Sequence, residues 1–353
     1  MAVPVTMASA SANASLQCAP LTRQRTGARS LPNTNGTRHR CRAARGATAG
    51  PPPAAAPSLG RPSGPRPLDH KVALITGANT GIGFETAKAL RQRDYQVVLA
   101  CRDKEKAEAA RRKLKELVPG ARSVEVAVMD LADLSTVRVW AKRAQDFGEP
   151  LDVLICNAGV MACPQQQTKD GFEYQLGVNH LGHFLLANMV TPLLTTPERP
   201  SRVVTVSSAA HFFGHINFKD LQSRSGYNPW KAYGQSKLAN VLMTYEMARR
   251  LSPNDNCTAN CLHPGVVATE LVRYLLPEQE SWWQQPLAKI NRAFSLTAEQ
   301  GAQTSVYLAA SPEVEGVSGK YYDKCKPVSS SKESYDAAVA ARLWDVSAEL
   351  VGL

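Results

Sequence analysis

Short apolar runs alternate with segments of helical periodicity from residue 71 onward. The apolar runs are nearly continuous, which is typical of strands buried on both faces of a parallel sheet. The pattern predicts strands at residues 71–76, 96–100, 123–129, 151–156, 202–207, 258–263 and 319–322. It predicts helices at residues 81–93, 104–117, 134–147, 172–194, 230–251, 298–310 and 337–350. Because parallel strands need right-handed crossovers, we expect one doubly wound α/β domain with about seven strands and helices on both faces.

Residues 1–68 differ in composition from the rest of the chain. They contain nine arginines and no lysine, aspartate or glutamate, and removing these nine charges from the net charge of +11 leaves about +2 for the remainder. No nucleic-acid surface is therefore expected. This leader is rich in Ala, Ser, Thr and Pro and has no long apolar run. It is predicted to be an organellar transit peptide and disordered linker, followed by a catalytic domain at residues 69–353.

The Pro and Gly residues between positions 50 and 67 oppose an amphipathic mitochondrial helix. The chloroplast, in its stroma or at its envelope, is therefore the predicted location, with the mitochondrion second and an ordinary disordered tail as the alternative reading of the leader. No apolar run reaches about 18 residues, so no transmembrane helix is expected. The eight cysteines have no paired metal-ligand spacing and predict no disulfide framework.

The first predicted strand runs into a glycine-rich loop that opens the first helix. Glycines there allow a tight turn and let a pyrophosphate approach the N–H groups of the helix N-terminus. The spacing is G-x-x-x-G-x-G rather than the common G-x-G-x-x-G, and a plain strand–helix turn is the structural alternative. The residues predicted to bind a dinucleotide are Gly77, Asn79, Thr80, Gly81, Ile82 and Gly83.

The end of the second strand selects between NAD and NADP. An acidic residue there would bond the ribose hydroxyls of NAD and repel a 2′-phosphate. This chain instead has Arg102, whose guanidinium fork pairs with phosphate. NADP(H) is therefore the predicted cofactor, and Asp103 is expected to be a helix N-cap rather than a ribose ligand.

Three further strand ends bring small or polar residues to the same edge of the sheet. The third ends in a carboxylate that suits the adenine amino group, and the fourth in small residues that let the backbone pass close to the nicotinamide ribose, although both stretches suit caps and turns equally well. The sixth is followed by a Pro-Gly pair that ends the regular structure, and the nicotinamide amide would sit there. The candidates are Asp130, Leu131, Asn157, Ala158, Gly159, Pro264, Gly265 and Val266.

Tyr233 and Lys237 lie four residues apart on a predicted helix and therefore share one face. A tyrosine has an ordinary pKa near 10, and a nearby ammonium lowers it by favouring the phenolate. Such a phenol exchanges a proton with a substrate oxygen near neutral pH. Ser207 and Ser208 close the fifth strand, where a hydroxyl faces the ligand crevice.

Asn179 lies inside the long helix predicted at residues 172–194, where a buried amide would bend the helix or hold a water. His180 and His183 follow it as an i, i+3 pair. No third ligand stands at a suitable spacing, so no metal is expected.

Together these motifs resemble the short-chain dehydrogenase/reductase superfamily. The resemblance covers almost all of the chain after the leader and implies a Rossmann-type fold. Residues 99–102, 179–184, 233–240 and 342–347 look like its retinol dehydrogenase-like branch, which includes a dehydrogenase-like subunit of the plant chloroplast import translocon. Light-dependent protochlorophyllide reductase is a more distant neighbour, because it resembles this chain less around the serines.

The resemblance implies a role for each catalytic candidate. Tyr233 would be the general acid in reduction and the base in oxidation. Lys237 would lower its pKa and bond the nicotinamide ribose. Ser208, the second of the serine pair, would polarise the substrate carbonyl, and Asn179 would hold a water that relays protons. The family forms dimers or tetramers in many members and monomers in others, so a homodimer is an open expectation.

The stretch at residues 271–294 is apolar and aromatic, and in this superfamily the corresponding segment covers the substrate. We therefore expect a small lipophilic aldehyde, ketone or alcohol as substrate, with ordinary core helices and a loop as the alternative reading. Trp282 and Trp283 also suit peripheral membrane contact. Four aromatic residues before Tyr233 are expected to line the same pocket: Phe212, Phe213, Tyr227 and Trp230.

The sequence thus predicts an NADP(H)-dependent oxidoreductase that interconverts a retinal- or apocarotenoid-like carbonyl and its alcohol. Two alternatives stay open. One is a tetrapyrrole reductase like protochlorophyllide reductase, and the other is an NADP(H)-sensing subunit of a chloroplast envelope import complex.

Overall fold

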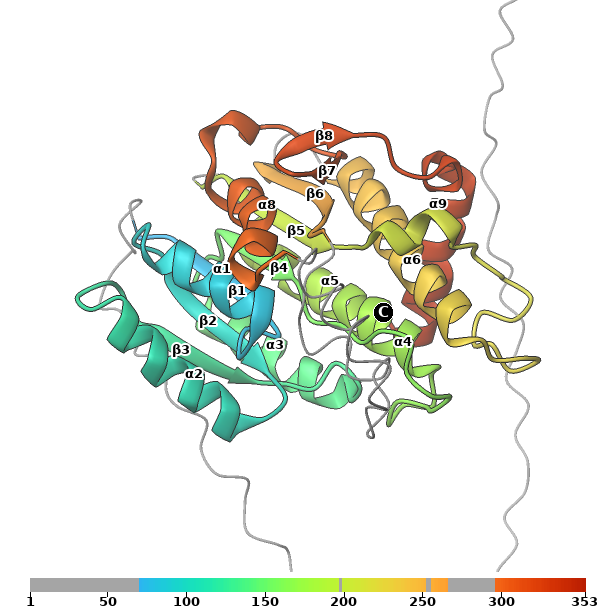
Figure 1. Cartoon of the computed structure of the whole chain (residues 1–353), viewed down its shortest axis with the longest axis horizontal. Coiled ribbons are helices and arrows are strands. Elements are labelled where there is room, and N and C mark those ends of the chain that lie inside the picture. The colour runs from blue at the N-terminus through green and yellow to red at the C-terminus, as the bar shows by residue number, and fades with distance from the viewer. Residues whose placement is uncertain (1–69, 197–198, 252–254, 266–295) are drawn as a thin grey trace, which may run out of the picture. The chain divides into compact units, whose positions relative to one another are not determined.

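A computed structural model of the chain describes residues 70–196, 199–251, 255–265 and 296–353. The predictions for the leader at residues 1–68, for Val266 and for the stretch at 271–294 with Trp282 and Trp283 lie outside these residues. Within them the chain builds an eight-stranded sheet with the strand order β3-β2-β1-β4-β5-β6-β7-β8 (Figure 1). The strands are β1 Val72–Thr76, β2 Gln96–Cys101, β3 Val124–Val128, β4 Val153–Cys156, β5 Ser201–Val206, β6 Cys257–His263, β7 Tyr321–Asp323 and β8 Lys326–Val328.

The parallel Rossmann-type sheet predicted from the sequence is confirmed, and seven of its strands lie where they are expected. Strands β1 to β7 pair in parallel, and β8 adds an antiparallel edge through Asp323↔Lys326 and Tyr321↔Val328. The strand β8 escapes prediction because it has only three residues, all exposed, and contains Pro327. Such a strand has neither the apolar run nor the alternation that marks buried strands.

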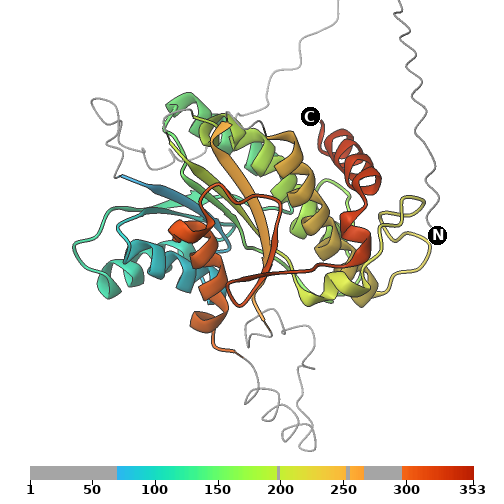
Figure 2. The same cartoon turned by 90° about the horizontal axis from the view of Figure 1, so that it is seen from above.

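Helices cover both faces of the sheet (Figure 2). Apolar residues of α1, α2 and α8 pack on one face, and those of α3, α5 and α6 pack on the other, where α9 lies against α6. The helices are α1 Gly81–Arg91, α2 Lys104–Leu117, α3 Leu134–Phe147, α4 Tyr174–Leu176, α5 Gly182–Leu194, α6 Pro229–Arg250, α8 Ala298–Ala310 and α9 Ala337–Val351. The predicted arrangement of a single domain with helices on both faces is therefore confirmed.

The helix predicted at residues 172–194 is interrupted. The three-residue α4 leads into a π-helical turn at Gly177–Leu181, and α5 continues from Gly182. A π turn inserts one extra residue into the helical hydrogen-bond ladder and is frequent at functional sites. Asn179 lies inside this turn and is fully buried, so the interruption of the helix coincides with the buried amide.

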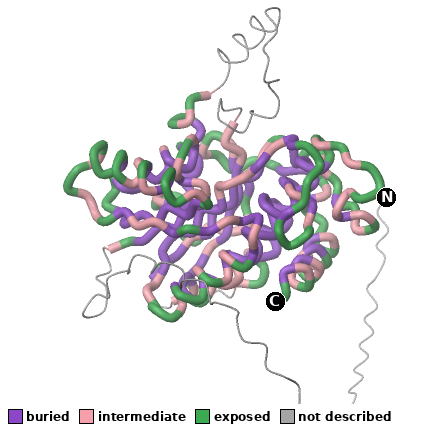
Figure 3. The backbone as a smooth tube through the Cα atoms, turned by 90° about the horizontal axis from the view of Figure 1, so that it is seen from below, coloured by how far each residue is buried: buried purple, intermediate pink, exposed green. Residues whose placement is uncertain are grey.

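The strands at the centre of the sheet are buried along their whole length (Figure 3). Every residue of β1, β2 and β4 is buried, because each of these strands has a neighbour on both sides and helices above and below. None of the helices that the structure describes is long and apolar enough to cross a membrane.

Candidate active site

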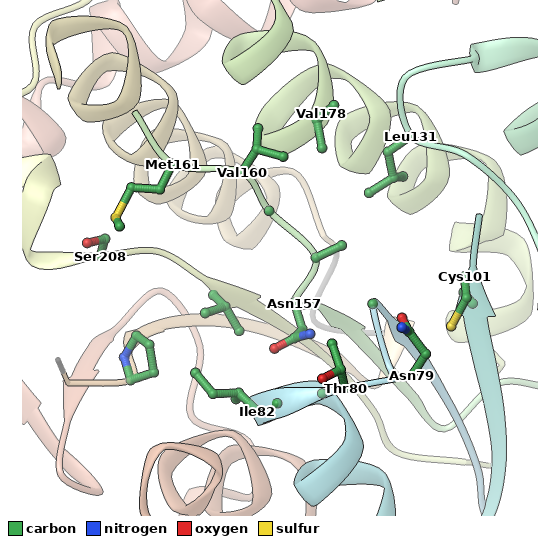
Figure 4. Close-up of a pocket in the computed structure, with 18 of the residues that line it drawn as sticks. Asn79, Thr80, Ile82, Cys101, Leu131, Asn157, Val160, Met161, Val178 and Ser208 are labelled. Carbon is green, nitrogen blue, oxygen red and sulfur yellow. The ribbon is translucent and has the colours of Figure 1, made fainter. Parts of the chain in front are cut away.

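A cavity of about 420 Å³ opens at the carboxyl ends of the strands, between β1 and β4, where the strand order reverses. Crevices at this position bind ligands in open α/β sheets, and the volume is that of a small-molecule site. Asn79 and Cys101 lie at one end of it, Met161 and Ser208 lie at the other, and Asn157 lies between them (Figure 4). We call the first the glycine-loop end, formed by residues 77–83 and Arg102, and the second the tyrosine end, formed by Ser208, Tyr233 and Lys237.

The structure brings most of the predicted site residues to this one cavity. Among the described residues predicted to be catalytic or to bind the cofactor, Asn179 alone does not line it. The predicted residues that line it are Gly77, Asn79, Thr80, Gly81, Ile82, Gly83, Arg102, Asp130, Leu131, Asn157, Ala158, Gly159, Ser208, Tyr233, Lys237, Pro264 and Gly265.

The glycine-loop end is built by close backbone packing. Gly77 has φ +65°, a conformation that side chains rarely adopt, and starts the turn out of β1. A Cβ at Gly83 would lie 2.4 Å from the carbonyl oxygen of Gly77 and 2.5 Å from Nδ2 of Asn157. Only glycine therefore lets the first turn of α1 rest against the end of β1 and expose its N–H groups to the cavity.

Thr76 joins this loop to the loop after β4, a link that the sequence reading missed. The Thr76 hydroxyl oxygen accepts hydrogen bonds from the N–H groups of Asn157 at 2.8 Å and Ala158 at 2.9 Å. The Asn157 side chain in turn donates to the Thr76 carbonyl at 2.8 Å. A threonine at the end of a first strand is common, and only its pairing with an asparagine at the end of another strand would have signalled this contact.

His183 completes the same network. Its Nδ1 lies 3.0 Å from the carbonyl oxygen of Asn179, and because a carbonyl only accepts, Nδ1 carries the proton. Its Nε2 therefore accepts from the Thr76 hydroxyl at 2.8 Å. Burial lowers the pKa of His183 to about 4, so the ring is neutral at physiological pH.

The other histidine of the i, i+3 pair also serves structure. Nε2 of His180 lies 2.8 Å from the hydroxyl of Ser347 on α9, and burial lowers the pKa of His180 to about 3. No group of three potential metal ligands occurs in the described part of the chain.

Arg102 and Asp103 follow β2 as the sequence suggests. Asp103 accepts a hydrogen bond from the N–H of Lys106 at 3.0 Å and so caps α2, as predicted. Arg102 lines the cavity and donates to the hydroxyl of Tyr174 at 3.3 Å. Lys106 lines the same region, one helical turn beyond the cap, and adds a second positive charge that the sequence reading did not single out.

Asp130 both lines the cavity and holds the local turn. Its Oδ1 accepts from the N–H of Ala132 at 2.9 Å. Leu131, next to it, packs against Gly182, where an added Cβ would approach the Leu131 Cβ to 2.8 Å. Asp130 and Leu131 can therefore both form the turn after β3 and contact a cofactor in the cavity.

The tyrosine end rests on α6. Asn228 caps this helix by accepting from the N–H groups of Trp230 and Lys231, and Pro229 occupies its first turn. Tyr233 and Lys237 then share one face, and Nζ of Lys237 lies 5.8 Å from the centre of the Tyr233 ring. Lys237 is 4 % exposed, and its Nζ donates to the carbonyl of Val206 at 3.2 Å.

The two serines after β5 have different partners. The Ser207 hydroxyl donates to the carbonyl of Lys237 at 2.7 Å and is committed to holding α6 against the sheet. Ser208 lines the cavity, its hydroxyl oxygen accepts from the N–H of Ala210 at 3.2 Å, and its side chain acts to lower the pKa of Tyr233. Of the pair, only Ser208 is therefore placed to touch a substrate oxygen beside the tyrosine.

Asn179 lies behind this wall in a fully paired position. Its Oδ1 accepts from the N–H of Val160 at 2.8 Å, and its Nδ2 donates to the Val160 carbonyl and to the Ser236 hydroxyl, each at 2.9 Å. A Cβ at Gly159 would lie 3.1 Å from Oδ1 of Asn179 and 3.3 Å from Nζ of Lys237. The amide and the ammonium thus converge on one glycine, whose lack of a side chain leaves room between them.

Burial dominates the electrostatics of the tyrosine end. It lowers the pKa of Lys237 to about 8, because the buried ammonium has lost its water. Burial also raises the pKa of Tyr233, and Ser208 only opposes that rise. The expectation that Lys237 brings this phenol below its ordinary pKa is therefore wrong for the protein alone, because burial of the phenol disfavours the phenolate.

The four aromatic residues expected in the pocket lie outside the cavity. Phe212 and Phe213 are 57 % and 59 % exposed and Trp230 is 44 % exposed. The Tyr227 hydroxyl donates to the Cys163 carbonyl at 2.8 Å and accepts from the Gln175 side chain, so it holds the loop after β4. The expectation fails because these rings pack on the outside of α6: Phe213 lies against Gly234, and the Trp230 ring lies 6.4 Å from the Tyr233 ring, edge to face.

Residues 71–280 match the family model for short chain dehydrogenases. The chain belongs to the short-chain dehydrogenase family. It is 45 % identical to human retinol dehydrogenase 14, over 84 % of this chain and 90 % of that protein. It is 46 % identical to human retinol dehydrogenase 13, over 81 % of this chain and 86 % of that protein. A crystal structure of an uncharacterized protein from Mycobacterium paratuberculosis is 38 % identical, with a TM-score of 0.65, over 81 % of this chain and 94 % of that one.

These relatives confirm the retinol dehydrogenase-like branch. This short-chain dehydrogenase is an oxidoreductase that acts on CH–OH and C=O groups of a small molecule with a nicotinamide cofactor. They support neither the tetrapyrrole reductase nor the import subunit that the sequence left as alternatives. The transit peptide and the boundary at residue 69 stay predictions.

The predicted chloroplast location is wrong. The two retinol dehydrogenases above are human proteins, and animals have no plastids. The similarity also gives no support to the mitochondrion, which was named second. The error has a physical source. A leader with many arginines and no acids is defined by its charge, and charge alone does not specify the organelle whose receptor reads it.

Proposed function

We propose that this short-chain dehydrogenase interconverts a lipophilic, retinal-like aldehyde or ketone and its alcohol with NADP(H), using Tyr233 as the acid and base. The observation that carries the proposal is the meeting of Tyr233, Ser208 and the buried Lys237 at one end of the cavity. When bound, the nicotinamide supplies or accepts the hydride at the carbon of the substrate.

The protein moves the proton. In reduction the Tyr233 hydroxyl donates its proton to the carbonyl oxygen as negative charge develops there, and in oxidation the phenolate takes it back. The Ser208 hydroxyl donates a second hydrogen bond to the same oxygen and orients it. Lys237 supplies positive charge beside the phenol, which stabilises the phenolate against the burial that disfavours it.

Asn179 and Gly159 support the proton path. The Asn179 amide is fixed by three hydrogen bonds, and the space over Gly159 lies between that amide and the Lys237 ammonium. We propose that a water in this space passes protons between Lys237 and solvent, as the sequence motif suggests. A side chain at position 159 would fill the space.

The cofactor ring system is proposed to extend toward the glycine-loop end, where Arg102 pairs with the 2′-phosphate of NADP(H). Lys106 lies in the same wall of the cavity, and the Asp103 carboxylate next to Arg102 accepts from the N–H of Lys106 and so caps α2. The site therefore offers a 2′-phosphate two cations, and the neighbouring acid is engaged by the helix cap.

The substrate class is proposed from two sources. The relatives carry the name retinol dehydrogenase, and retinol is a long apolar alcohol. The cavity near Ser208 is lined by apolar side chains, including Val160 and Met161 (Figure 4). Membrane contact through Trp282 and Trp283 and a homodimer stay predictions.

A carbonyl panel tests the proposal. Purified protein is incubated with all-trans-retinal, a medium-chain aldehyde and a short water-soluble aldehyde, each with NADPH or NADH, and the nicotinamide absorbance is followed. We expect turnover of the apolar carbonyls with NADPH. A preference for NADH would refute the role of Arg102, and turnover of the short aldehyde alone would refute the lipophilic substrate.

A further inference from the structure

Two histidines that the mechanism above does not use lie on either side of the peptide bond that follows Ser208. His211 comes from the 3-10 turn at Ala209–Phe213 and is fully buried. His263 ends β6 and lines the cavity. One contacts the carbonyl of the Ser208–Ala209 peptide, and the other contacts its N–H.

The hydrogen-bond partners of His211 fix its tautomer. Its Nδ1 lies 2.7 Å from the Ser208 carbonyl oxygen, which only accepts, so Nδ1 carries the proton. Its Nε2 lies 3.1 Å from the backbone nitrogen of Ser331, which only donates, so Nε2 is unprotonated. His211 is therefore neutral, and it ties the peptide after Ser208 to the segment that follows β8.

His263 has the opposite tautomer. Its Nδ1 accepts from the N–H of Ala209 at 3.3 Å, so the ring proton is on Nε2. The Ser208–Ala209 peptide is thus held from both edges, by a donor on its carbonyl and by an acceptor on its N–H. Because the plane of this peptide defines ψ of Ser208, which is 158°, the two rings fix the direction in which the Ser208 side chain leaves the backbone.

We propose that His211 and His263 are positioning residues for the reaction, which act as a clamp that aims the Ser208 hydroxyl at the substrate oxygen beside Tyr233. The clamp rests on the proposed function, since it acts through Ser208. It requires both rings to be neutral, because a proton on Nδ1 of His263 would face the N–H of Ala209, and a proton on Nε2 of His211 would face the N–H of Ser331.

The surroundings keep the rings neutral at physiological pH. Burial lowers the pKa of both histidines, and His263 lowers the pKa of His211 further. From β7 and its turn, Asp323 raises the pKa of His263 and Lys324 lowers it. The Tyr321 hydroxyl faces Nδ1 of His211 at 3.5 Å. On acidification the clamp should open, and kcat should fall while cofactor affinity persists.

Paired substitutions separate the two hydrogen bonds of each ring. In His263→Asn the amide oxygen takes the place of Nδ1 as an acceptor without a titrating group, whereas His263→Leu has no acceptor. In His211→Asn the amide nitrogen lies near the position of Nδ1 and can still donate to Ser208, whereas the longer side chain of His211→Gln places its amide near the position of Nε2, beside Ser331 and away from the Ser208 carbonyl. Exposed His215, which pairs with Glu333, supplies the control His215→Ala.

We expect His263→Leu and His211→Gln to lower kcat with retinal and NADPH about tenfold, the effect of one lost hydrogen bond, with the Kd of NADPH unchanged. The Asn variants should recover most of that loss, and the double variant His211→Asn/His263→Asn should lack the acid limb expected in the kcat of wild type. His215→Ala should match wild type. Unchanged kcat in His211→Gln, or an acid limb retained in the double variant, would overturn the clamp even if His263→Leu fails to fold.

A second readout does not depend on turnover. Side-chain ¹⁵N–¹H spectra of the histidine-labelled protein, assigned with the two Asn variants, should show a proton on Nδ1 of His211 and on Nε2 of His263. The reverse tautomers would refute the clamp. If wild type reduces no carbonyl but these tautomers are found, the proposed function fails while the described contacts stand.

Discussion

The two ends of the cavity are built from different parts of the chain. At the glycine-loop end the wall is backbone, and its precision comes from Gly77 and Gly83, which have no side chain to interfere. At the tyrosine end the wall is side chains, and Tyr233 and Lys237 are nearly fully buried there. Substitutions at the glycine-loop end should therefore exclude the cofactor sterically. Substitutions at the tyrosine end should abolish the reaction and leave cofactor binding intact.

The sharpest test of this contrast is Tyr233→Phe. The ring and its packing stay, but the proton donor is lost, so we expect kcat to fall by about 10³-fold, within the range for general acid–base catalysis. The Kd of NADPH, measured by fluorescence titration, should stay within twofold. Tyr245→Phe is the matched control, because Tyr245 is a buried tyrosine of the same helix whose hydroxyl bonds Ser330. An equal loss in both variants would mean that the helix, and not the phenol, matters.

The next effect belongs to the other end. Gly83→Ala places a Cβ 2.4 Å from the Gly77 carbonyl oxygen, so the loop or α1 must shift. We expect the Kd of NADPH to rise by about 100-fold, since a displacement of that size disrupts positioned contacts. Gly120→Ala is the control for an added methyl group, because nothing lies within 4 Å of the Cβ position of Gly120, whose φ is +74°. It should cost about 1 kcal/mol of stability and leave binding alone. Normal NADPH binding by Gly83→Ala would contradict the backbone account.

Arg102→Ala tests the one side chain on which the glycine-loop end is proposed to depend. Removal of a charge-assisted contact should raise the KM for NADPH about 30-fold and leave the KM for NADH nearly unchanged. Lys106→Ala should have a smaller effect, because its side chain is 71 % exposed and pairs with Asp103. A parallel rise for both cofactors would show that Arg102 serves the loop and not the phosphate.

Lys237→Met should be inactive, but its effect on stability should be small and favourable, so the variant is more stable than wild type. A base whose native pKa is lowered from 10.5 to about 8 binds fewer protons in the native than in the unfolded state, so the wild type gains stability as pH rises. Below pH 8 the buried charge costs about 3 kcal/mol, of which about 1 is offset by the bond to Val206.

The variant should therefore unfold about 2 kcal/mol higher than wild type at pH 7 in urea titrations, and this advantage should disappear as pH approaches 10.5. Lys231→Met, at an exposed position of the same helix, should show no such pH-dependent gain. An advantage that stays constant with pH would have to come from packing.

The sequence predicts the backbone of this site better than its electrostatics. Short local motifs predict the strand ends and the glycine-rich loop, and seven strands and the cavity wall lie at the predicted positions. The direction of the Tyr233 pKa shift could not be read in that way, because it depends on how deeply two side chains are buried. The Tyr–Lys spacing gives their proximity and says nothing of the water that surrounds them.

The π-helical turn and the Thr76 network show the same limit from another side. Asn179 is recognisable as a polar residue in an apolar helix, but the break at Gly177–Leu181 depends on a partner, Val160, that lies in a different loop. Contacts between residues distant in sequence leave no local periodicity to detect. The error about the organelle is of a different kind, because it came from composition where no structure is described.

The Thr76 hydroxyl bonds residues 81 and 107 positions further along the chain, at Asn157 and His183. Contacts of such separation form late, because the entropy of closing the intervening loop must be overcome before they contribute. The cavity is therefore absent from partly folded forms that contain only β1 to β3. Catalytic competence should appear in refolding as a single late event, after most helical signal has returned and at the same rate as the final burial of the central strands.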